Sequence, residues 1–333
     1  MHTLLTRITY FHGSPANERY TQVQAQIGRG LRDQHPSRSA QGAANAIVSV
    51  PHCQVAITTI ARPVVTEPLE IISLGAGVQS SVMALMAARG ELTPMPVAAI
   101  FADTQWEPRG VYDHLSWLEG ELPFPVYRVT AGNIRDDVMA GLNTTGQRFA
   151  VMPFFTGNGG MGRRQCTAEY KIAPIRLKLR EMLGLRPRQR APKGVQIVQW
   201  LGISTDEATR MKPSRDKWVQ NRWPLIEQRI SRHQCEVWFA KHFPARTLSK
   251  SACVGCPFHN DAMWRDMKLH DQVSWLDAVD FDLNLRAGDK GKYKEKNYLH
   301  RSLLDLNKVD LRNIEDRGQL NLFENECDGM CGL

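Results

Sequence analysis

The chain has 333 residues, 42% of them hydrophobic, and a formal net charge of +8. This length exceeds that of one average domain, and the apolar content is enough for a buried core. The sequence has no run of about 20 apolar residues that could span a bilayer and no signal-peptide layout, so we expect a cytoplasmic protein without a membrane partner.

The composition changes along the chain and predicts three regions. Residues 1–66 are rich in Gly, Ser, Gln, Arg and Asn, and prolines interrupt them, which predicts an irregular or partly ordered N-terminal extension. Residues 67–250 are predicted to form a nucleotide-binding α/β domain. Residues 251–333 are predicted to form a helical C-terminal region with a Cys-x-x-Cys pair and a cysteine-containing tail.

Strands and helices alternate from residue 69 onward. The patterns predict strands at 69–74, 96–102, 125–129 and 195–201, and helices at 80–88, 108–118, 133–141, 174–183 and 231–242, with a mobile loop at 143–165 and further helices around Trp264 and Trp275. Asn133 and Ser231 are the expected N-caps of two of these helices. The order predicts an α/β fold with a doubly wound, mostly parallel sheet, whose ligands gather at the carboxyl ends of the strands.

A glycine-rich turn separates the first predicted strand from its helix. Backbone N–H groups in such a turn can approach phosphate oxygens, and the helix N-terminus adds partial positive charge. The turn is neither a Walker A loop nor a Rossmann loop, and a purely structural turn is the alternative. The candidate nucleotide-binding residues are Gly75, Ala76, Gly77, Gln79, Ser80 and Ser81, together with Asp103 at the end of the second strand.

Cysteine and positive charge are the other two informative features. Seven cysteines are too few for a disulfide scaffold, so we expect thiolates that bind metal or react. Cys53 and Cys235 are interpreted as structural. Between Arg163 and Lys193, ten basic residues accompany two glutamates. Such a basic window would attract nucleotide phosphates or an RNA backbone, or would form a solvated helix face.

Four segments resemble the phosphoadenosine phosphosulfate (PAPS) reductase family of the PP-loop adenine nucleotide α-hydrolase superfamily. They are the glycine-rich turn, Phe101–Gln105, Cys166–Ile175 and Gly202–Arg210. The resemblance implies a PP-loop fold, an adenine nucleotide (ATP, or adenylylsulfate or PAPS) and catalytic roles for Lys171 and Arg210. Gly75 and Gln79 stand where the family has serine and aspartate, which leaves Asp103 as the nearby carboxylate for any magnesium ion.

The resemblance also implies metal ligands. Adenylylsulfate reductases hold a 4Fe-4S cluster with a tandem cysteine pair and a later Cys-x-x-Cys, of which this chain keeps Cys166, Cys253 and Cys256. Three ligands leave one iron open, as in the related tRNA thiolation enzymes. The spacing alone favours structural zinc, with His259 as a fourth ligand, so zinc is the alternative to the cluster.

The C-terminal tail carries two more cysteines, Cys327 and Cys331. Their surroundings resemble parts of the Glu-Cys-Gly-Leu-His terminus of sulfonucleotide reductases, whose cysteine attacks sulfate sulfur and is then released by thioredoxin. That likeness implies a catalytic thiol, and the alternatives are a frayed terminus or a fourth metal ligand.

Three functions follow from these features. The first is an iron–sulfur-dependent sulfurtransferase that uses ATP to adenylate and thiolate a tRNA or DNA, supplied by a sulfur donor. The second is an adenylylsulfate or PAPS reductase with a thioredoxin-like reductant. The third is a non-catalytic nucleotide- or zinc-binding module. A homodimer is a further expectation.

Overall fold

A parallel β-sheet forms the centre of the part of the chain that the structure describes. This computed structural model describes residues 67–141, 152–248, 250–287 and 296–312. The chain divides into two units, Met1–Arg62 and Pro63–Leu333, and every described residue lies in the second. The predicted N-terminal extension, Cys53 and the tail with Cys327 and Cys331 therefore lie outside the described residues.

The main sheet has five parallel strands in the order β3-β2-β1-β5-β6. The strands are β1 (Leu69–Leu74), β2 (Ala98–Asp103), β3 (Val126–Thr130), β5 (Ile197–Leu201) and β6 (Val219–Arg222). The four predicted strands are confirmed, and the first matches to the residue. The fifth, β6, was not predicted, because its sequence Val-Gln-Asn-Arg has little apolar pattern.

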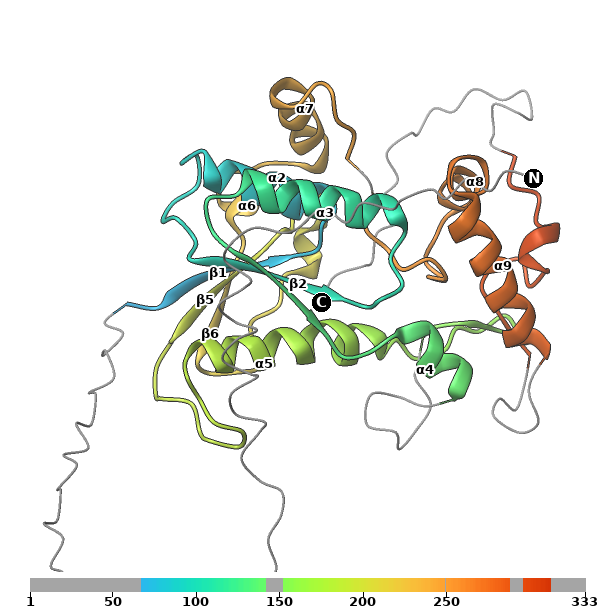
Figure 1. Ribbon diagram of the computed structural model, residues 1–333, viewed down its shortest axis with the longest axis horizontal. Coiled ribbons are helices and arrows are strands. Elements are labelled where there is room, and N and C mark those ends of the chain that lie inside the picture. The colour runs from blue at the N-terminus through green and yellow to red at the C-terminus, as the bar shows by residue number, and fades with distance from the viewer. Residues whose placement is uncertain (1–66, 142–151, 249, 288–295, 313–333) are drawn as a thin grey trace, which may run out of the picture. The chain divides into compact units, whose positions relative to one another are not determined.

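Helices cover both faces of this sheet (Figure 1). Helices α2 (Val78–Ala88), α3 (Arg109–Glu121) and α7 (Arg232–His242) lie on one face, and α5 (Ala173–Met182) lies on the other. Because side chains alternate along a strand, Ile72 of β1 packs in the core of the first face and Ile71 in the core of the second. The predicted doubly wound α/β architecture is confirmed.

Two predicted helix caps are confirmed. The Asn133 side chain accepts a 2.9 Å hydrogen bond from the N–H of Arg135 at the start of α4 (Ile134–Ala140), and Gly141 ends that helix with a left-handed φ of 69°. Ser231 forms a capping box with Gln234 at the start of α7. Since these side chains satisfy N–H groups that have no partner inside the helix, they fix where each helix begins.

The segment predicted as the loop 143–165 is corrected in its second half. Residues 142–151 lie outside the described residues, but β4 (Phe155–Thr156) pairs antiparallel with β7 (Asn297–Tyr298). The next helix also begins earlier than predicted, because a π-helical segment, Thr167–Ile172, leads directly into α5. A two-residue strand and a π-helical turn have no periodic sequence signal, which explains both differences.

The C-terminal helices are α8 (Asp261–His270) and α9 (Gln272–Ala287), as the sequence predicts. Trp264 and Trp275 are buried between them, with ring centroids 6.5 Å apart. The remaining elements are a 3₁₀ turn at Thr205–Arg210, α6 (Pro224–Glu227) and a 3₁₀ turn at Leu306–Lys308. Among the described residues, no helix is both long enough and apolar enough to cross a bilayer.

The end of β5 passes so close to the start of α2 that Gly202 has no room for a side chain. A Cβ there would lie 2.7 Å from the backbone N and Cα of Ser80. We expect Gly202→Ala to lower the free energy of unfolding by about 1–3 kcal/mol, as overpacking does. Urea titration measures this. The matched control is Gly120→Ala on α3, where no heavy atom lies within 4 Å; equal losses in both variants would contradict the close approach.

Candidate nucleotide and thiol site

The glycine-rich turn lies at the point where the strand order of the sheet reverses. From β1 the chain crosses to β2 on one side, whereas β5 pairs with β1 on the other side. In open parallel sheets, ligands bind outside the carboxyl ends of the strands at such a point. The turn after β1 and Gly202 after β5 both lie there.

The turn itself is held by the hydroxyl of Ser80. Its Oγ accepts a 3.1 Å hydrogen bond from the N–H of Gly75 and donates to the carbonyl of Gly77 at 3.3 Å. Ala76 between them has a left-handed φ of 54°, which is unusual for a residue with a side chain. Gly77 is the N-cap residue of α2 and provides no side-chain cap, and the first turn of the helix has no acidic residue. This arrangement favours an anion at the helix N-terminus.

Two other predicted loop residues are directed elsewhere. The Gln79 side chain contacts Ser204, with a nitrogen-to-oxygen distance of 3.4 Å, and Arg232, at 3.5 Å. Ser81 is fully buried, and its hydroxyl lies 2.9 Å from the Nε2 atom of His114 on α3. Ser81 thus joins two helices of the same face. Of the two serines predicted to donate to phosphate, Ser80 is the one in the turn.

Asp103 lies at the carboxyl end of β2. Its Oδ1 atom accepts hydrogen bonds from the backbone N–H of Gln105 at 2.7 Å and from the Tyr112 hydroxyl at 2.8 Å. Burial, followed by the hydrogen bond to Asp103, raises the pKa of Tyr112 well above its usual value. Tyr112 therefore stays a hydroxyl donor at neutral pH, and Asp103 orders the turn that follows β2.

Arg210 forms an ion pair with Glu207 in the 3₁₀ turn after β5, with 2.6 Å between Nη1 and Oε2. The Glu207 side chain is buried, with 5% of its surface exposed. The neighbouring Asp206 accepts a 2.8 Å hydrogen bond from the backbone N–H of Arg232. Contacts of Gly202 with Ser80 and of Ser204 with Gln79 thus place the segment Gly202–Arg210 beside the glycine-rich turn. Arg210 itself contacts Glu207.

Cys166, Cys253 and Cys256 line one pocket, here called the thiol pocket. Its other lining residues are Thr104, Ile134, Met152, Pro153, Arg164, Thr167, Lys171, Pro257 and Phe258. The segment that leads to the Cys-x-x-Cys pair also approaches the glycine-rich turn, because a Cβ added to Gly77 would lie 3.6 Å from the Cβ of Ser251. The three predicted thiol ligands and Lys171 are therefore brought together near the carboxyl edge of the sheet.

Glu107 is a residue of this region that the sequence analysis missed. Its side chain is 1% exposed, and its Oε1 atom lies 3.1 Å from the Thr104 hydroxyl, 3.5 Å from the Cys253 sulfur and 3.9 Å from Lys171 Nζ. Its Oε2 atom is buried without a hydrogen-bond partner among the described residues. Lys171 offsets the buried charge. The available signal was a carboxylate in the segment that follows the second strand, four residues beyond Asp103.

The thiol pocket has the donor chemistry of an iron–sulfur site. Three thiols are soft ligands of the kind that such clusters use, and Arg164 and Lys171 supply positive charge beside them. In the described part of the chain, no group of three or more His, Cys, Asp or Glu side chains is arranged to hold a metal ion.

His259 and Cys235 are buried side chains with structural surroundings. Burial lowers the pKa of His259 to about 3, and its ring packs edge-on against Trp264 with centroids 4.5 Å apart. His259 does not line the thiol pocket. Cys235 is fully buried in α7, and burial raises the pKa of its thiol to about 12. Cys235 therefore stays a neutral thiol, as its predicted structural role requires.

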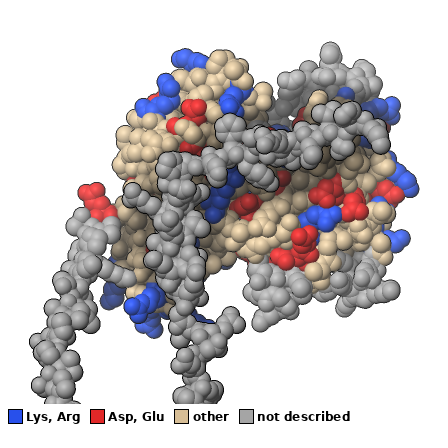
Figure 2. Space-filling view, viewed as in Figure 1, with Lys and Arg blue, Asp and Glu red and all other residues tan. Residues whose placement is uncertain are grey.

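The basic window divides between two edges of the sheet. Arg164 and Lys171 line the thiol pocket, whereas Arg186, Arg188 and Lys193 are exposed in the segment between α5 and β5. Because α5 runs back across the sheet, that segment lies at the amino ends of the strands (Figure 1). On the face drawn in Figure 2, Lys and Arg side chains stand at several separate places with acidic side chains among them.

Comparisons with known proteins assign no family. No protein-family model matches the chain, and no curated protein matches it. Among solved structures, the chain is similar to phosphoadenylyl-sulfate (PAPS) reductase from Candida auris in its phosphate complex. The identity is 12% and the TM-score 0.34, over 56% of this chain and 84% of that chain. This likeness is too weak to argue from, so the site is interpreted from its own residues.

The buried contact between Ser81 and His114 predicts a pH dependence of stability. Burial, aided by the charge of Arg246, lowers the pKa of His114 from 6.5 to about 4. The unfolded chain therefore binds this proton at higher pH than the folded chain does, so the contribution of His114 to stability is present above pH 6.5 and is lost as the pH falls toward 4.

We expect His114→Gln to make the decline in unfolding free energy across this pH window shallower, as measured by urea titrations at several pH values. The matched control is His270→Gln, which makes the same replacement at an exposed imidazole on α8. If His114→Gln keeps the wild-type slope, the pKa of this imidazole does not differ between the folded and the unfolded chain.

Proposed function

We propose that this chain is a PP-loop enzyme that binds an adenine nucleotide at the glycine-rich turn and transfers sulfur to a nucleic acid with the help of an iron–sulfur cluster. One observation carries the proposal. The segment before Cys253 lies against the turn at Gly77, while Cys166, Cys253 and Cys256 line one pocket with Lys171. Phosphate chemistry and thiolate chemistry would thus share one edge of the sheet.

The nucleotide half of the proposal rests on the start of α2. Backbone N–H groups in the first turn of a helix lack partners within that helix and bind anions. Gly77 provides no capping side chain, and the Ser80 hydroxyl bridges the turn between Gly75 and Gly77. A triphosphate or a sulfonucleotide would supply the anion. Asp103 is the carboxylate at this edge that could serve a magnesium ion.

The thiol half of the proposal rests on the donor set. Cys166, Cys253 and Cys256 would hold a 4Fe-4S cluster, which when bound would supply an iron without a protein thiolate that can carry sulfide. Lys171 and Arg164 would balance negative charge in the pocket, and Glu107 would position Lys171 and Thr104 around Cys253. Structural zinc at the same cysteines is the alternative.

In the proposed reaction, ATP is cleaved between its α and β phosphates. An oxygen of the nucleic-acid base attacks the α phosphorus, pyrophosphate leaves, and AMP stays on the base. Sulfide then displaces AMP and forms the carbon–sulfur bond. The helix N-terminus would stabilise the charge that develops on the phosphate oxygens. Arg164 and Lys171, which line the thiol pocket, would add electrostatic attraction for a polyanion such as tRNA or DNA.

Reduction of a sulfonucleotide is the second candidate. The cations that line the thiol pocket, Arg164 and Lys171, favour it because they could hold the sulfate group of adenylylsulfate or PAPS beside the thiols. That reaction would also use a tail thiol, Cys327 or Cys331, and a thioredoxin-like reductant.

One assay separates the two reactions. Anaerobically purified protein is incubated with sulfide, a dithiol reductant and either ATP or adenylylsulfate, with and without RNA or DNA. Pyrophosphate, sulfite and thiolated nucleic acid are measured. We expect pyrophosphate that depends on added nucleic acid, and we expect Cys256→Ala to lose thiolated product. Cys235→Ala, which removes a buried thiol outside the thiol pocket, is the matched control.

The other outcomes of this assay are equally clear. Sulfite without pyrophosphate would replace the transferase with the reductase. Neither product, from protein that binds nucleotide and contains zinc but no iron, would favour a non-catalytic module.

The glycine-rich turn is tested separately by Ser80→Ala. The variant loses the acceptor for the Gly75 N–H and the donor to the Gly77 carbonyl, so we expect nucleotide binding to weaken by about 1–2 kcal/mol. Isothermal titration calorimetry with ATP and with adenylylsulfate measures this. Ser116→Ala, an exposed serine on α3, is the control. Unchanged affinity in Ser80→Ala would contradict the assignment of this turn.

A further inference from the structure

We propose that Trp106 is a positioning residue that sets the place of the Cys253 and Cys256 thiols. The inference rests on the proposed function in one respect, which is that those thiols are the proposed cluster ligands. The contact that positions them lies within the protein itself. Trp106 lies in the segment that follows β2, is 5% exposed and packs in the same core as both cysteines.

Trp106 holds the Cys-x-x-Cys loop from two sides. Its backbone carbonyl accepts a 2.8 Å hydrogen bond from the N–H of Val254. Its indole ring lies against Gly255, where an added Cβ would be 2.1 Å from Cη2 and 2.7 Å from Cζ3. Glycine is therefore required at position 255 for lack of space, and the indole surface defines how deep the loop can lie.

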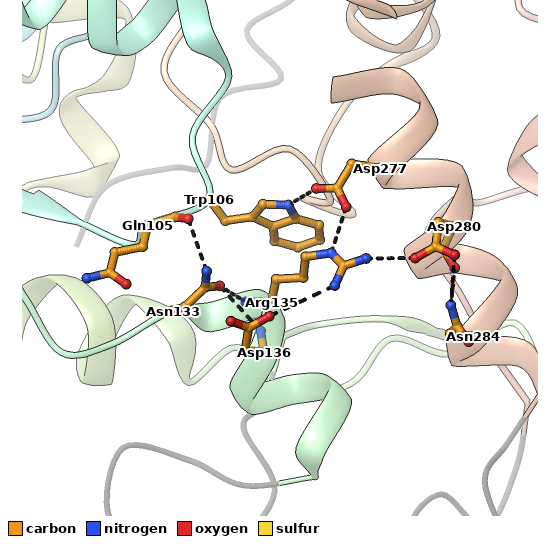
Figure 3. Close-up of polar contacts among 8 residues, drawn as sticks. All are labelled: Gln105, Trp106, Asn133, Arg135, Asp136, Asp277, Asp280 and Asn284. Carbon is orange, nitrogen blue, oxygen red and sulfur yellow. Dashed lines mark hydrogen bonds and ion pairs between the residues drawn. The ribbon is translucent and has the colours of Figure 1, made fainter. Parts of the chain in front are cut away.

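The indole ring is itself fixed by helix α9. Its Nε1 atom donates a 2.5 Å hydrogen bond to Asp277, and the ring packs on Phe281 with centroids 4.6 Å apart. Asp277 is in turn paired with Arg135 of α4, with 2.7 Å between Oδ1 and Nε (Figure 3). A second carboxylate on α9, Asp280, binds Arg135 at the same distance.

The network closes on the residue before Trp106. Asn133 accepts a hydrogen bond from the N–H of Arg135 and donates one to the carbonyl of Gln105 at 3.4 Å (Figure 3). Gln105 has a left-handed φ of 57°, a conformation that costs energy for a residue with a side chain. Contacts from both Asn133 and Asp103 hold it there, so the chain is turned at Gln105 in the way that presents Trp106 to the loop.

The test is a steric rescue. Gly255→Ala should push the loop off the indole, and the double variant Gly255→Ala with Trp106→Phe should restore it, because phenylalanine lacks the indole atoms that clash. The matched control is Gly110→Ala on α3, where no heavy atom lies within 4 Å. Circular dichroism and thermal unfolding check that each variant is folded.

The first readout needs no cofactor. In metal-free protein, the rate at which iodoacetamide alkylates Cys253 and Cys256 is followed by mass spectrometry. Both residues are 8% exposed in the wild type. We expect Gly255→Ala to raise the rate roughly tenfold or more, as overpacking at a well-packed site displaces it, and the double variant to return toward the wild-type rate.

The second readout is iron content after anaerobic reconstitution with Fe²⁺ and sulfide. We expect affinity for iron to fall roughly 10- to 100-fold in Gly255→Ala, the cost typical of lost supporting contacts around metal ligands, with recovery in the double variant. Nucleotide binding should not change, because the glycine-rich turn is left intact.

The outcomes separate this inference from the proposed function. If the wild type takes up no iron but alkylation follows the expected rescue pattern, the cluster proposal fails and the positioning role stands. If Gly255→Ala behaves as the wild type, or if the folded double variant is as reactive as Gly255→Ala, Trp106 does not position the loop.

Discussion

The parallel pairing of β1 with both β2 and β5 is the constraint on which the rest of the site depends. It brings the segments after three strands to one edge of the sheet: the glycine-rich turn after β1, Thr104 to Glu107 after β2, and Gly202 to Arg210 after β5. The close approach of Gly202 to Ser80 then fixes the turn against its neighbour. Without this pairing, residues far apart in the sequence would not meet.

The sequence predicts the alternating framework well because its signals are local. Apolar runs mark β1, β2, β3 and β5, and side chains such as Asn133 and Ser231 mark helix starts by satisfying nearby N–H groups. The prediction of a loop at 143–165 is wrong in its second half, because β4 is formed by pairing with β7, much later in the chain. The polar strand β6 was not predicted because it too is defined by its pairing partner, β5, and has little apolar pattern of its own.

In the candidate site, too, some residues can be identified from the sequence and others only from contacts between distant segments. The three cysteines and Lys171 could be chosen from residue type and resemblance, and the fold places them around one pocket. Trp106 and Glu107 were not chosen, because their importance comes from contacts with Gly255 and Cys253, far away in the sequence, and the position of Glu107 shortly after β2 was the one local signal for it. Ser81 shows the converse: its type fits phosphate binding, but its hydroxyl faces His114.

The β4–β7 pair gives the C-terminal region a role in shaping the pocket. Met152 and Pro153, just before β4, and Arg164, after it, line the thiol pocket, and β4 has its ladder partner in Asn297–Tyr298. A shortened chain that stopped ahead of Asn297 would leave one wall of that pocket without its backbone support. Residues 296–312 thus support the thiol pocket through the β4–β7 pairing. Removing them would change the shape of the pocket although they do not line it.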